Sequence, residues 1–329
     1  MRVLTELDRG RQLGWHTGAQ LYASINGRPL LDLAVGDARP AVPMTTTTIV
    51  EWASATKPIT CTALAILWQR GLLGLDDPVR EHLPEFVGKD EVTVEHLLTH
   101  IAGLTTTITG QASAAQYVAN ICASPANPGR CAYNSIAMWL IAELVTRIAN
   151  EPFDAFIRKE IFAPSGMTDC WLAMPPAVYA TIEPRLATLP GIPRSGTAPW
   201  VTWGRPTGGI HGPINQLARF YESLPQLLTP QTLAAMTRPH ITNRHDEILK
   251  ATVSRGLGFL LASSNPAHAY GDRASPQVFG HGGQTWSTAF TDPTHNLTAA
   301  LYWNGPATPA IHSTRLPHTL NALYDDLLV

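Results

Sequence analysis

Long apolar runs and blocks of like charge are missing from this sequence, and we expect no signal peptide. No stretch approaches the ~18 consecutive apolar residues that a transmembrane helix needs. The first residues carry acids early and lack the apolar segment of a signal peptide. The 23 basic and 25 acidic residues give a formal net charge of -2, which excludes a strongly basic nucleic-acid or membrane-binding surface. We therefore expect a cytoplasmic protein that has neither nucleic acid nor membrane as a partner.

Cysteine is also scarce, and none of the four cysteines forms a Cys-x-x-Cys pair. A zinc or redox motif of that type is therefore unsupported. We expect free, buried thiols, with a Cys122–Cys131 bridge as the alternative if the protein is exported. The 12 histidines show no His-Glu-x-x-His spacing. These patterns predict no metal site and no cofactor.

Lysine is the rarest charged residue, with 4 lysines against 19 arginines. One of the four, Lys57, stands three residues after Ser54 in the stretch Glu51-Trp-Ala-Ser-Ala-Thr-Lys-Pro-Ile-Thr60. The spacing predicts a helix that ends near Gly71, with Ser54 at its start and Lys57 one turn later on the same side. The apolar residues expected to form its buried face are Ile59, Ala63, Ile66 and Leu67.

The pairing of Ser54 with Lys57 suits nucleophilic catalysis. A serine hydroxyl is a poor nucleophile unless a neighbouring base takes its proton. A lysine amine can do so where burial or nearby positive charge lowers its pKa, whereas arginine stays protonated. The motif is weak by itself, because Ser-x-x-Lys occurs by chance about once in a few hundred residues. The other interpretation makes Ser54 a helix N-cap.

Strand patterns lie at both ends of the chain, and helical patterns lie between them. Asn26-Gly27 separates two strand-like segments and predicts a hairpin at 20–25 and 28–35. A second hairpin is expected at 286–291 and 297–303, followed by a last helix over 320–328, after Pro317.

These patterns predict one domain, 1–329, of the α/β (α+β) class. An antiparallel sheet built from both termini and flanked by helices would form one lobe, about 1–58 and 225–329. The inserted segment, about 59–224, would form a helical lobe. We expect the active cleft where the two lobes meet.

Two further polar motifs follow Ser54-Ala-Thr-Lys57 in chain order: Tyr133-Asn134-Ser135 and His281-Gly282-Gly283. They correspond in order to the Ser-x-x-Lys, Ser-Asp-Asn and Lys-Thr-Gly set of class A β-lactamases and penicillin-binding proteins. The chain resembles the serine β-lactamase-like superfamily over nearly its whole length, and most of all its class C β-lactamase, esterase and D-peptidase branch. Other stretches that carry the resemblance are 72–79, 96–104, 128–133 and 279–283.

The resemblance implies a β-lactamase-like fold and a role for each motif residue. Ser54 would be the nucleophile that forms an acyl-enzyme, and Lys57 would share or receive its proton. Tyr133 would be the second acid/base and would pass a proton to the leaving group. The backbone N–H groups of Ser54 and Gln284 would form the oxyanion hole, which acts on charge that develops in the transition state.

Two positions depart from the family pattern. Where the second motif usually ends in Asn, this chain has Ser135 with Asn134 beside it, and which of the two faces Lys57 stays open. This change weighs against β-lactam and peptide recognition. His281 stands where β-lactamases have lysine, and a mostly neutral histidine favours neutral or weakly anionic acyl substrates.

Other residues are candidates for substrate binding or for structural roles. Trp203 and Trp286 line an acyl pocket in one interpretation and pack in the core in the other. His100 is expected to be a structural hydrogen-bonding group. The candidate substrate-binding residues are therefore Asn134, Ser135, Trp203, His281, Gly282, Gly283 and Trp286.

We therefore expect a serine acyl-transfer enzyme that acts on a small ester or amide metabolite through a Ser54 ester. With water as acceptor it would be a carboxylesterase or amidohydrolase. With an amine or alcohol it would be an ATP-independent transacylase, suited to a step of small-molecule biosynthesis. The alternatives are a D-specific peptidase, a β-lactamase or penicillin-binding enzyme, and a catalytically silent binding protein on the same scaffold.

Overall fold

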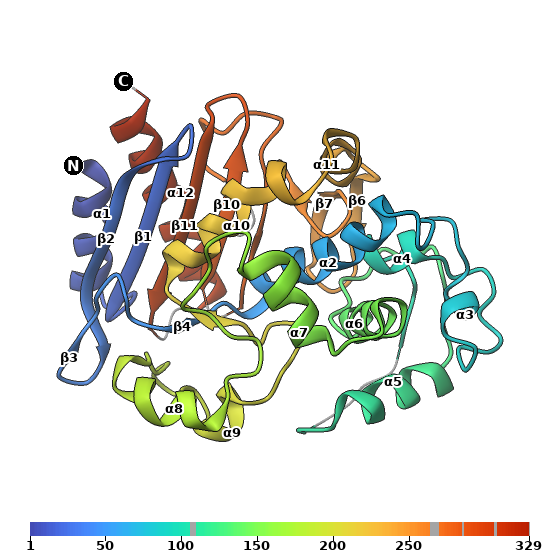
Figure 1. The fold of residues 1–329 in the computed structure, drawn as a ribbon. Coiled ribbons are helices and arrows are strands. Elements are labelled where there is room, and N and C mark those ends of the chain that lie inside the picture. Colours follow the sequence, from blue (N-terminus) through green and yellow to red (C-terminus); the bar gives the residue numbers. More distant parts are fainter. Residues whose placement is uncertain (106–109, 264–269, 285, 306–307, 329) are drawn as a thin grey trace.

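One large antiparallel sheet organises the molecule (Figure 1). The structure, a computed structural model, describes residues 1–105, 110–263, 270–284, 286–305 and 308–328. Within these residues the sheet has nine strands in the order β3-β2-β1-β11-β10-β9-β8-β7-β6. Their bounds are β1 Gly18–Ile25, β2 Arg28–Arg39, β3 Val42–Pro43, β6 Ile241–Asp246, β7 Ala251–Arg255, β8 Leu260–Leu261, β9 Phe279–Gly282, β10 Ser287–Asp292 and β11 Leu297–Asn304.

The two predicted hairpins are confirmed, and they meet at the centre of the sheet. β1 and β2 are joined at Asn26-Gly27, where both residues have positive φ, as a tight hairpin turn requires. β10 pairs with β11, and β11 pairs with β1 from Gly18↔Asn304 to Ile25↔Leu297. The first and last strands of the chain are therefore neighbours, which confirms the prediction of a sheet built from both termini.

Alternate residues of the central strands face two separate cores. On β1, Leu21 packs into the core beneath α1 (Arg2–Gln12) and α12 (Pro309–Leu327), whereas Tyr22 packs into the core on the other face. This alternation follows from the two-residue period of a strand. Because helices cover both faces, every residue of β11 is buried.

Helix α12 is longer than the sequence predicts. It spans Pro309–Leu327 and contains Pro317, where the prediction places its start at residue 320. A proline in a helix removes one hydrogen bond and crowds the preceding turn. The burial of Leu316, Leu320 and Leu323 against the sheet offsets that loss, since each removes a large apolar side chain from water.

The segment between the two groups of strands is mainly helical, as predicted. Helix α10 nevertheless packs on β1, β10 and β11, so it belongs to the sheet lobe, and the helical lobe ends before residue 214 rather than at 224 (Figure 1). The bounds are α2 Lys57–Gln69, α3 Val79–His82, α4 Val94–Leu98, α5 Ala114–Ala123, α6 Ala137–Ala149, α7 Phe153–Ile157, α8 Pro176–Ile182, α9 Ala198–Val201, α10 Ile214–Leu227 and α11 Pro230–Thr237, with the short strands β4 Val50–Glu51 and β5 His211–Gly212.

Helix α2 is buried on all sides, whereas the apolar spacing predicts one buried face. Every residue from Lys57 to Leu67 is buried, and the helix contacts α6, α7 and β9. Its polar residues are accommodated by local bonds; the Thr60 hydroxyl, for example, donates to the Pro206 carbonyl at 2.7 Å. A helix enclosed in this way is held rigidly, and the start of α2 is thereby fixed relative to the sheet.

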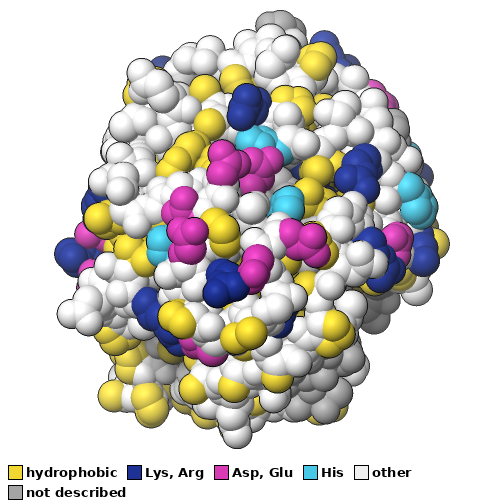
Figure 2. Space-filling view, turned by 90° about the vertical axis from the view of Figure 1, so that its right-hand side faces the viewer, with side chains coloured by type: hydrophobic (Ala, Val, Ile, Leu, Met, Phe, Trp, Pro, Cys, Tyr) yellow, Lys and Arg dark blue, Asp and Glu magenta, His cyan; other side chains and the backbone are white. Residues whose placement is uncertain are grey.

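The face of the molecule shown in Figure 2 carries both signs of charge. On the side seen in Figure 2, acidic and basic side chains are interspersed with scattered hydrophobic ones. Among the described residues, no helix is long and apolar enough to cross a bilayer. All four cysteines are free and buried, which confirms the expectation of buried thiols and leaves no Cys122–Cys131 bridge.

Candidate active site

Ser54 lies on a tight turn at the junction of the two lobes. Strand β4 pairs with β5, and the chain then enters a 3₁₀ turn, Ala53–Thr56, that leads directly into α2. Ala53, immediately before the serine, has φ 44°, a backbone region that non-glycine residues rarely occupy. Such a conformation persists only where the surroundings enforce it.

The residue before this turn, Trp52, is clamped from both sides. Its backbone N–H donates to the Ile210 carbonyl at 2.9 Å, and its indole N–H donates to the Gly212 carbonyl at 2.9 Å. Its own carbonyl accepts the Ser287 hydroxyl at 2.6 Å. Elements from the helical segment and from β10 therefore position the Ser54 turn together.

The side chains of Ser54 and Lys57 are joined by a hydrogen bond. Lys57 Nζ lies 2.8 Å from Ser54 Oγ and also donates to the Thr207 carbonyl at 2.8 Å. Lys57 is 1% exposed, and no described carboxylate forms an ion pair with it. Ser54 is not a helix N-cap, because Trp52 occupies that position in the 3₁₀ turn and Thr56 occupies it in α2. The amine is thus aimed at the hydroxyl.

Tyr133 lies against the same amine. The ring centroid is 5.0 Å from Lys57 Nζ and 5.5 Å from the guanidinium carbon of Arg255. The backbone N–H of Tyr133 donates to the Asp246 carboxylate at 3.1 Å, and that carboxylate also forms a fully buried ion pair with Arg255. Lys57 therefore contacts both Ser54, from the preceding turn, and Tyr133, from the segment before α6.

His100 supports this cluster as a neutral residue. Its ring centroid lies 4.7 Å from that of Tyr133, and its Nδ1 lies 3.0 Å from the Asn134 carbonyl oxygen. Burial holds the pKa of His100 well below its usual range, and the positive charges of Arg255 and Lys57 add to the effect. The side chain is buried and does not line the cavity at Ser54, in line with the structural role expected for it.

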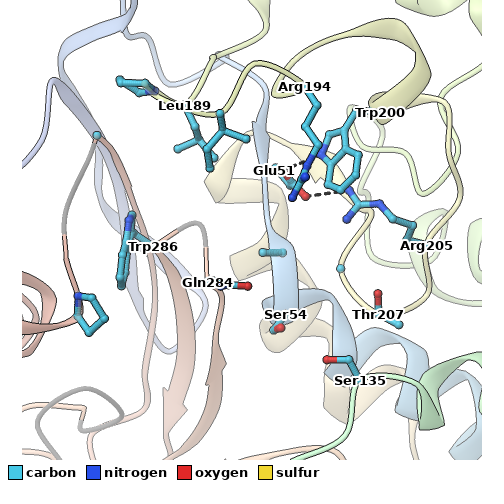
Figure 3. A pocket seen from close by; sticks show the side chains of 16 residues that line it. Glu51, Ser54, Ser135, Leu189, Arg194, Trp200, Arg205, Thr207, Gln284 and Trp286 are labelled. Atoms are coloured by element: carbon cyan, nitrogen blue, oxygen red, sulfur yellow. Dashed lines mark hydrogen bonds and ion pairs between the residues drawn. The ribbon is translucent and has the colours of Figure 1, made fainter. Parts of the chain in front are cut away.

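Ser135, rather than Asn134, faces the cavity at Ser54. Ser135 lines the cavity together with Ser54, and Figure 3 shows their side chains close to one another. The Asn134 amide instead binds the backbone: its nitrogen donates to the Leu104 carbonyl at 2.5 Å, and its oxygen accepts the Ile136 N–H at 2.9 Å. The proposal of Asn134 as a substrate-binding residue is therefore not supported by its geometry.

The third motif lies beside the Ser54 turn rather than in the cavity. Neither His281 nor the two glycines line the cavity; His281 is 3% exposed, with Nδ1 2.7 Å from the Gly282 carbonyl oxygen. A Cβ on Gly283 would lie 2.4 Å from the Trp52 carbonyl oxygen, so only glycine allows the chain just after β9 to approach the Ser54 turn this closely. Gln284, the next residue, lines the cavity with Ser54.

The two candidate tryptophans have different places. Trp286 lines the cavity, as one interpretation predicts. Trp203 does not: its indole N–H donates to the Ala112 carbonyl at 3.2 Å, and its ring lies 5.6 Å from that of Trp200 and 6.5 Å from that of Trp139. Its N–H and ring are engaged by neighbouring protein groups, so the interpretation as a packing residue holds for Trp203.

The cavity itself has a volume of about 570 Å³, which suits a small organic ligand. Ser54, Ser135 and Gln284 lie at one end, and Trp286 lies at the side (Figure 3). The wall far from Ser54 is formed by Glu51, which belongs to the stretch before Ser54, and by three residues that no motif or spacing indicates: Arg194, Trp200 and Arg205 (Figure 3).

That wall is built around a buried ion pair. Arg205 donates to Glu51 at 2.8 Å, and the Trp200 indole N–H donates to the other Glu51 oxygen at 3.1 Å. The Arg205 guanidinium carbon lies 3.8 Å from the Trp200 ring centroid, a cation–π contact. Glu51 belongs to the stretch around Ser54, whereas its partners lie 149 and 154 residues later, so no local spacing reveals the pairing.

Comparison with known proteins agrees with this geometry. The family model described as Beta-lactamase matches residues 7–324. The chain belongs to the beta-lactamase family. Esterases, penicillin-binding-protein-like chains and β-lactamases are among the relatives in this family of serine hydrolases, which confirms the resemblance drawn from the three motifs.

Individual beta-lactamase family members give a closer view. "Esterase/beta-lactamase LipL" of Mycobacterium tuberculosis is 30% identical over 188 residues, 54% of this chain and 43% of LipL, so the match spans less than half of that relative. A penicillin-binding protein homologue from Caulobacter crescentus has a TM-score of 0.86 at 26% identity, covering 99% of this chain and 97% of its own. "EstCE1, a hydrolase with promiscuous acyltransferase activity" has a TM-score of 0.83 at 19% identity, covering 98% and 97% of the two chains, and shows the shared fold.

Proposed function

We propose that this chain is a serine acyl-transfer enzyme that works through an acyl ester on Ser54 and acts on a small ester or amide. The observation that carries the proposal is the 2.8 Å contact between Lys57 Nζ and Ser54 Oγ at the end of a ligand-sized cavity. Esterases among the relatives support the hydrolytic form of this chemistry.

In acylation, Ser54 Oγ attacks the carbonyl carbon of the donor while its proton passes to Lys57. The carbonyl oxygen becomes an oxyanion, for which the N–H groups of Ser54 and Gln284 are the proposed donors. The bond to the leaving group then breaks, and that group takes a proton from Tyr133. The proton on Lys57 then passes to the Tyr133 phenol oxygen and restores the starting state; the Tyr133 ring centroid lies 5.0 Å from Lys57 Nζ.

In deacylation, the acceptor attacks the Ser54 ester and loses a proton to the same Lys57 and Tyr133 pair. The Ser54 oxygen leaves as the hydroxyl, with that proton. Water as acceptor gives a carboxylic acid, and an amine or alcohol gives a new amide or ester. EstCE1, a hydrolase with promiscuous acyltransferase activity, supports testing both acceptors. Residence in the cytoplasm and a place in small-molecule biosynthesis remain proposals.

Intact-mass spectrometry after mixing with activated esters tests the proposal, with Ser54→Ala as the control. We expect a covalent mass gain on the native chain alone. Adding an amine during decay of the adduct then separates hydrolysis from acyl transfer by the products formed. A D-alanyl amide and a chromogenic β-lactam serve as donors for the two alternative enzyme classes. The absence of any adduct or turnover with every donor would favour a silent binding protein instead.

A further inference from the structure

The charged side chains that line the cavity do not belong to the third motif. His281 replaces a lysine in that motif, which predicts neutral or weakly anionic acyl substrates, but His281 does not line the cavity. Among the described lining residues the charged ones are Glu51, Arg194 and Arg205. The cavity therefore carries one more positive than negative charge.

Two of these three charges neutralise one another. Both oxygens of Glu51 are engaged, one by Arg205 at 2.8 Å and the other by the Trp200 indole N–H at 3.1 Å. Arg205 is 9% exposed, and its positive charge is matched by this carboxylate. The pair forms a rigid wall rather than a binding site for a further ion.

Arg194 is the remaining cation, and the structure presents it to the cavity. Its guanidinium carbon lies 4.3 Å from the Trp200 ring centroid, and none of the described carboxylates forms an ion pair with it. The contact with the indole face orients the planar guanidinium while leaving its N–H groups available. Figure 3 shows Arg194 at the end of the cavity far from Ser54.

The loop that carries Arg194 is tied by its own hydrogen bonds. The Leu189 N–H donates to the Ser195 hydroxyl at 2.9 Å, and the Ser195 N–H donates to the Ile192 carbonyl at 2.9 Å. The Arg194 carbonyl accepts both the N–H and the hydroxyl of Thr197, at 3.1 and 2.8 Å. A cation held on such a loop loses less conformational freedom when it binds an anion.

The loop that carries Arg194 also contributes apolar side chains to the cavity. Leu189, Pro190 and Ile192 line the cavity from this loop, and Trp286 adds a further apolar surface. Tyr133, from which the leaving group would take its proton, does not line the cavity. In the proposed chemistry the leaving group lies beside Tyr133 and therefore outside the cavity. The cavity is then left for the acyl group on Ser54, which extends past these residues toward Arg194.

We propose that the preferred acyl donor is an ester or amide of a dicarboxylic acid, whose free carboxylate binds Arg194 while an aliphatic spacer passes Leu189 and Trp286. A planar guanidinium matches a carboxylate through two parallel N–H···O bonds. This inference rests on the proposed Ser54 chemistry and specifies its substrate class.

The test compares two 4-nitrophenyl esters of equal length: the monoester of adipic acid, which keeps a free carboxylate, and the same ester with that carboxylate converted to a primary amide. We expect the native enzyme to show a higher kcat/KM for the carboxylate ester. Arg194→Gln should lower that kcat/KM roughly tenfold, since one charge-assisted contact is lost, and leave the amide ester within about twofold. Arg194→Lys should restore part of the preference.

Arg238→Gln is the matched control, because Arg238 is another exposed arginine without an ion pair among the described residues and lies outside the cavity. Arg238→Gln should leave kcat/KM unchanged for both esters. Equal rates for the two esters, or an equal loss for both in Arg194→Gln, would overturn the inference while leaving the Ser54 chemistry intact. Failure of every ester to acylate Ser54 would instead reject the proposed function.

A carboxylate on the acceptor is the remaining source of an anion. The acyl-enzyme formed from the uncharged amide ester is mixed with glycine, which carries a carboxylate, or with glycinamide, which does not. This comparison distinguishes a carboxylate on the acceptor from a carboxylate on the acyl donor. We expect Arg194→Gln to leave the ratio of the two aminolysis rates unchanged. A selective loss of transfer to glycine would place the anion on the acceptor and overturn the assignment to the acyl group.

Discussion

The buried carboxylate of Asp246 accepts the backbone N–H of Tyr133 at 3.1 Å and links the proposed second acid/base to the β6–β7 hairpin. The same carboxylate accepts the N–H groups of Ile248 and Leu249, both at 2.9 Å, and pairs with Arg255. One side chain thus fixes both the backbone of Tyr133 and the cation that lies 5.5 Å from its ring.

Asp246→Asn should destabilise the protein by about 3–5 kcal/mol, because it leaves the Arg255 charge buried without its partner. We expect the double variant Asp246→Asn/Arg255→Met to recover much of that stability, and neither variant to recover full kcat. Urea denaturation and ester kinetics measure the two effects. A native kcat in the double variant would show that the Asp246–Arg255 pair is not required to position Tyr133.

Lys57→Ala should lower the acylation rate by about 10²–10⁴-fold, the range typical of a lost general base. Removing a buried amine also removes its desolvation cost, so we expect the free energy of unfolding to stay level or rise. Burst kinetics measure the acylation rate, and urea denaturation measures the free energy of unfolding. A loss of both activity and stability would make Lys57 a structural residue.

Gly283→Ala should reduce kcat and destabilise the protein by about 1–3 kcal/mol, as overpacking does. The new methyl group would lie 2.4 Å from the Trp52 carbonyl oxygen and push the end of β9 and the residue after it away from the Ser54 turn. Gly282→Ala is the matched control, because its methyl group would lie 3.6 Å from the nearest atom. Similar effects at both positions would argue against this close approach as the cause.

His16 should make the protein less stable in acid. Burial, and next the charge of Arg315, lowers the pKa of His16 from 6.5 to about 4. As the pH falls, the unfolded chain therefore binds a proton at His16 before the folded chain does. The contribution of neutral His16 to the free energy of unfolding is complete above pH 6.5, is lost as the pH drops from 6.5 toward 4, and does not change further below pH 4. The loss amounts to about 3 kcal/mol. Urea titrations at several pH values measure it.

The control for this pH dependence uses two substitutions. His16→Gln should flatten the fall in the free energy of unfolding between pH 6.5 and 4, since the titrating ring is gone. His318→Gln, at an exposed histidine of α12, should leave the fall as it is. An unchanged slope in His16→Gln would assign the acid sensitivity to other groups.

The contact between Ser54 and Lys57 could be predicted from sequence because it depends on a single helical turn. The same holds for the Asn26-Gly27 hairpin, whose turn chemistry is local. The burial of α2 on all sides was missed, since periodicity reports only its most apolar face, while Thr60 is satisfied by the distant Pro206 carbonyl. Pro317 likewise suggested a helix boundary that tertiary packing of α12 overrides.

The wall of the cavity far from Ser54 could not be predicted from the sequence, because its residues are far apart in the chain. Glu51, Trp200 and Arg205 meet across 149 and 154 residues, and the last two lie on the four-residue helix α9 and on the loop after it, neither of which has a readable periodicity. The side chains of Asn134 and Ser135 differ in direction only through the local backbone, which residue type does not report. Trp203 and Trp286 were equivalent in sequence, and only their neighbours distinguish them.

The clamp on Trp52 has a consequence for how the protein is made. Its carbonyl is held by Ser287, 235 residues later in the chain, and β1 is completed only when β11 pairs with it. Such distant pairings form slowly, because a long loop must close before they contribute. A ribosome-bound chain that has emerged only to the end of the helical lobe would carry Ser54 and Lys57 but not the strand that sets their turn. We expect nascent chains to gain reactivity toward activated esters only after β10 and β11 have emerged.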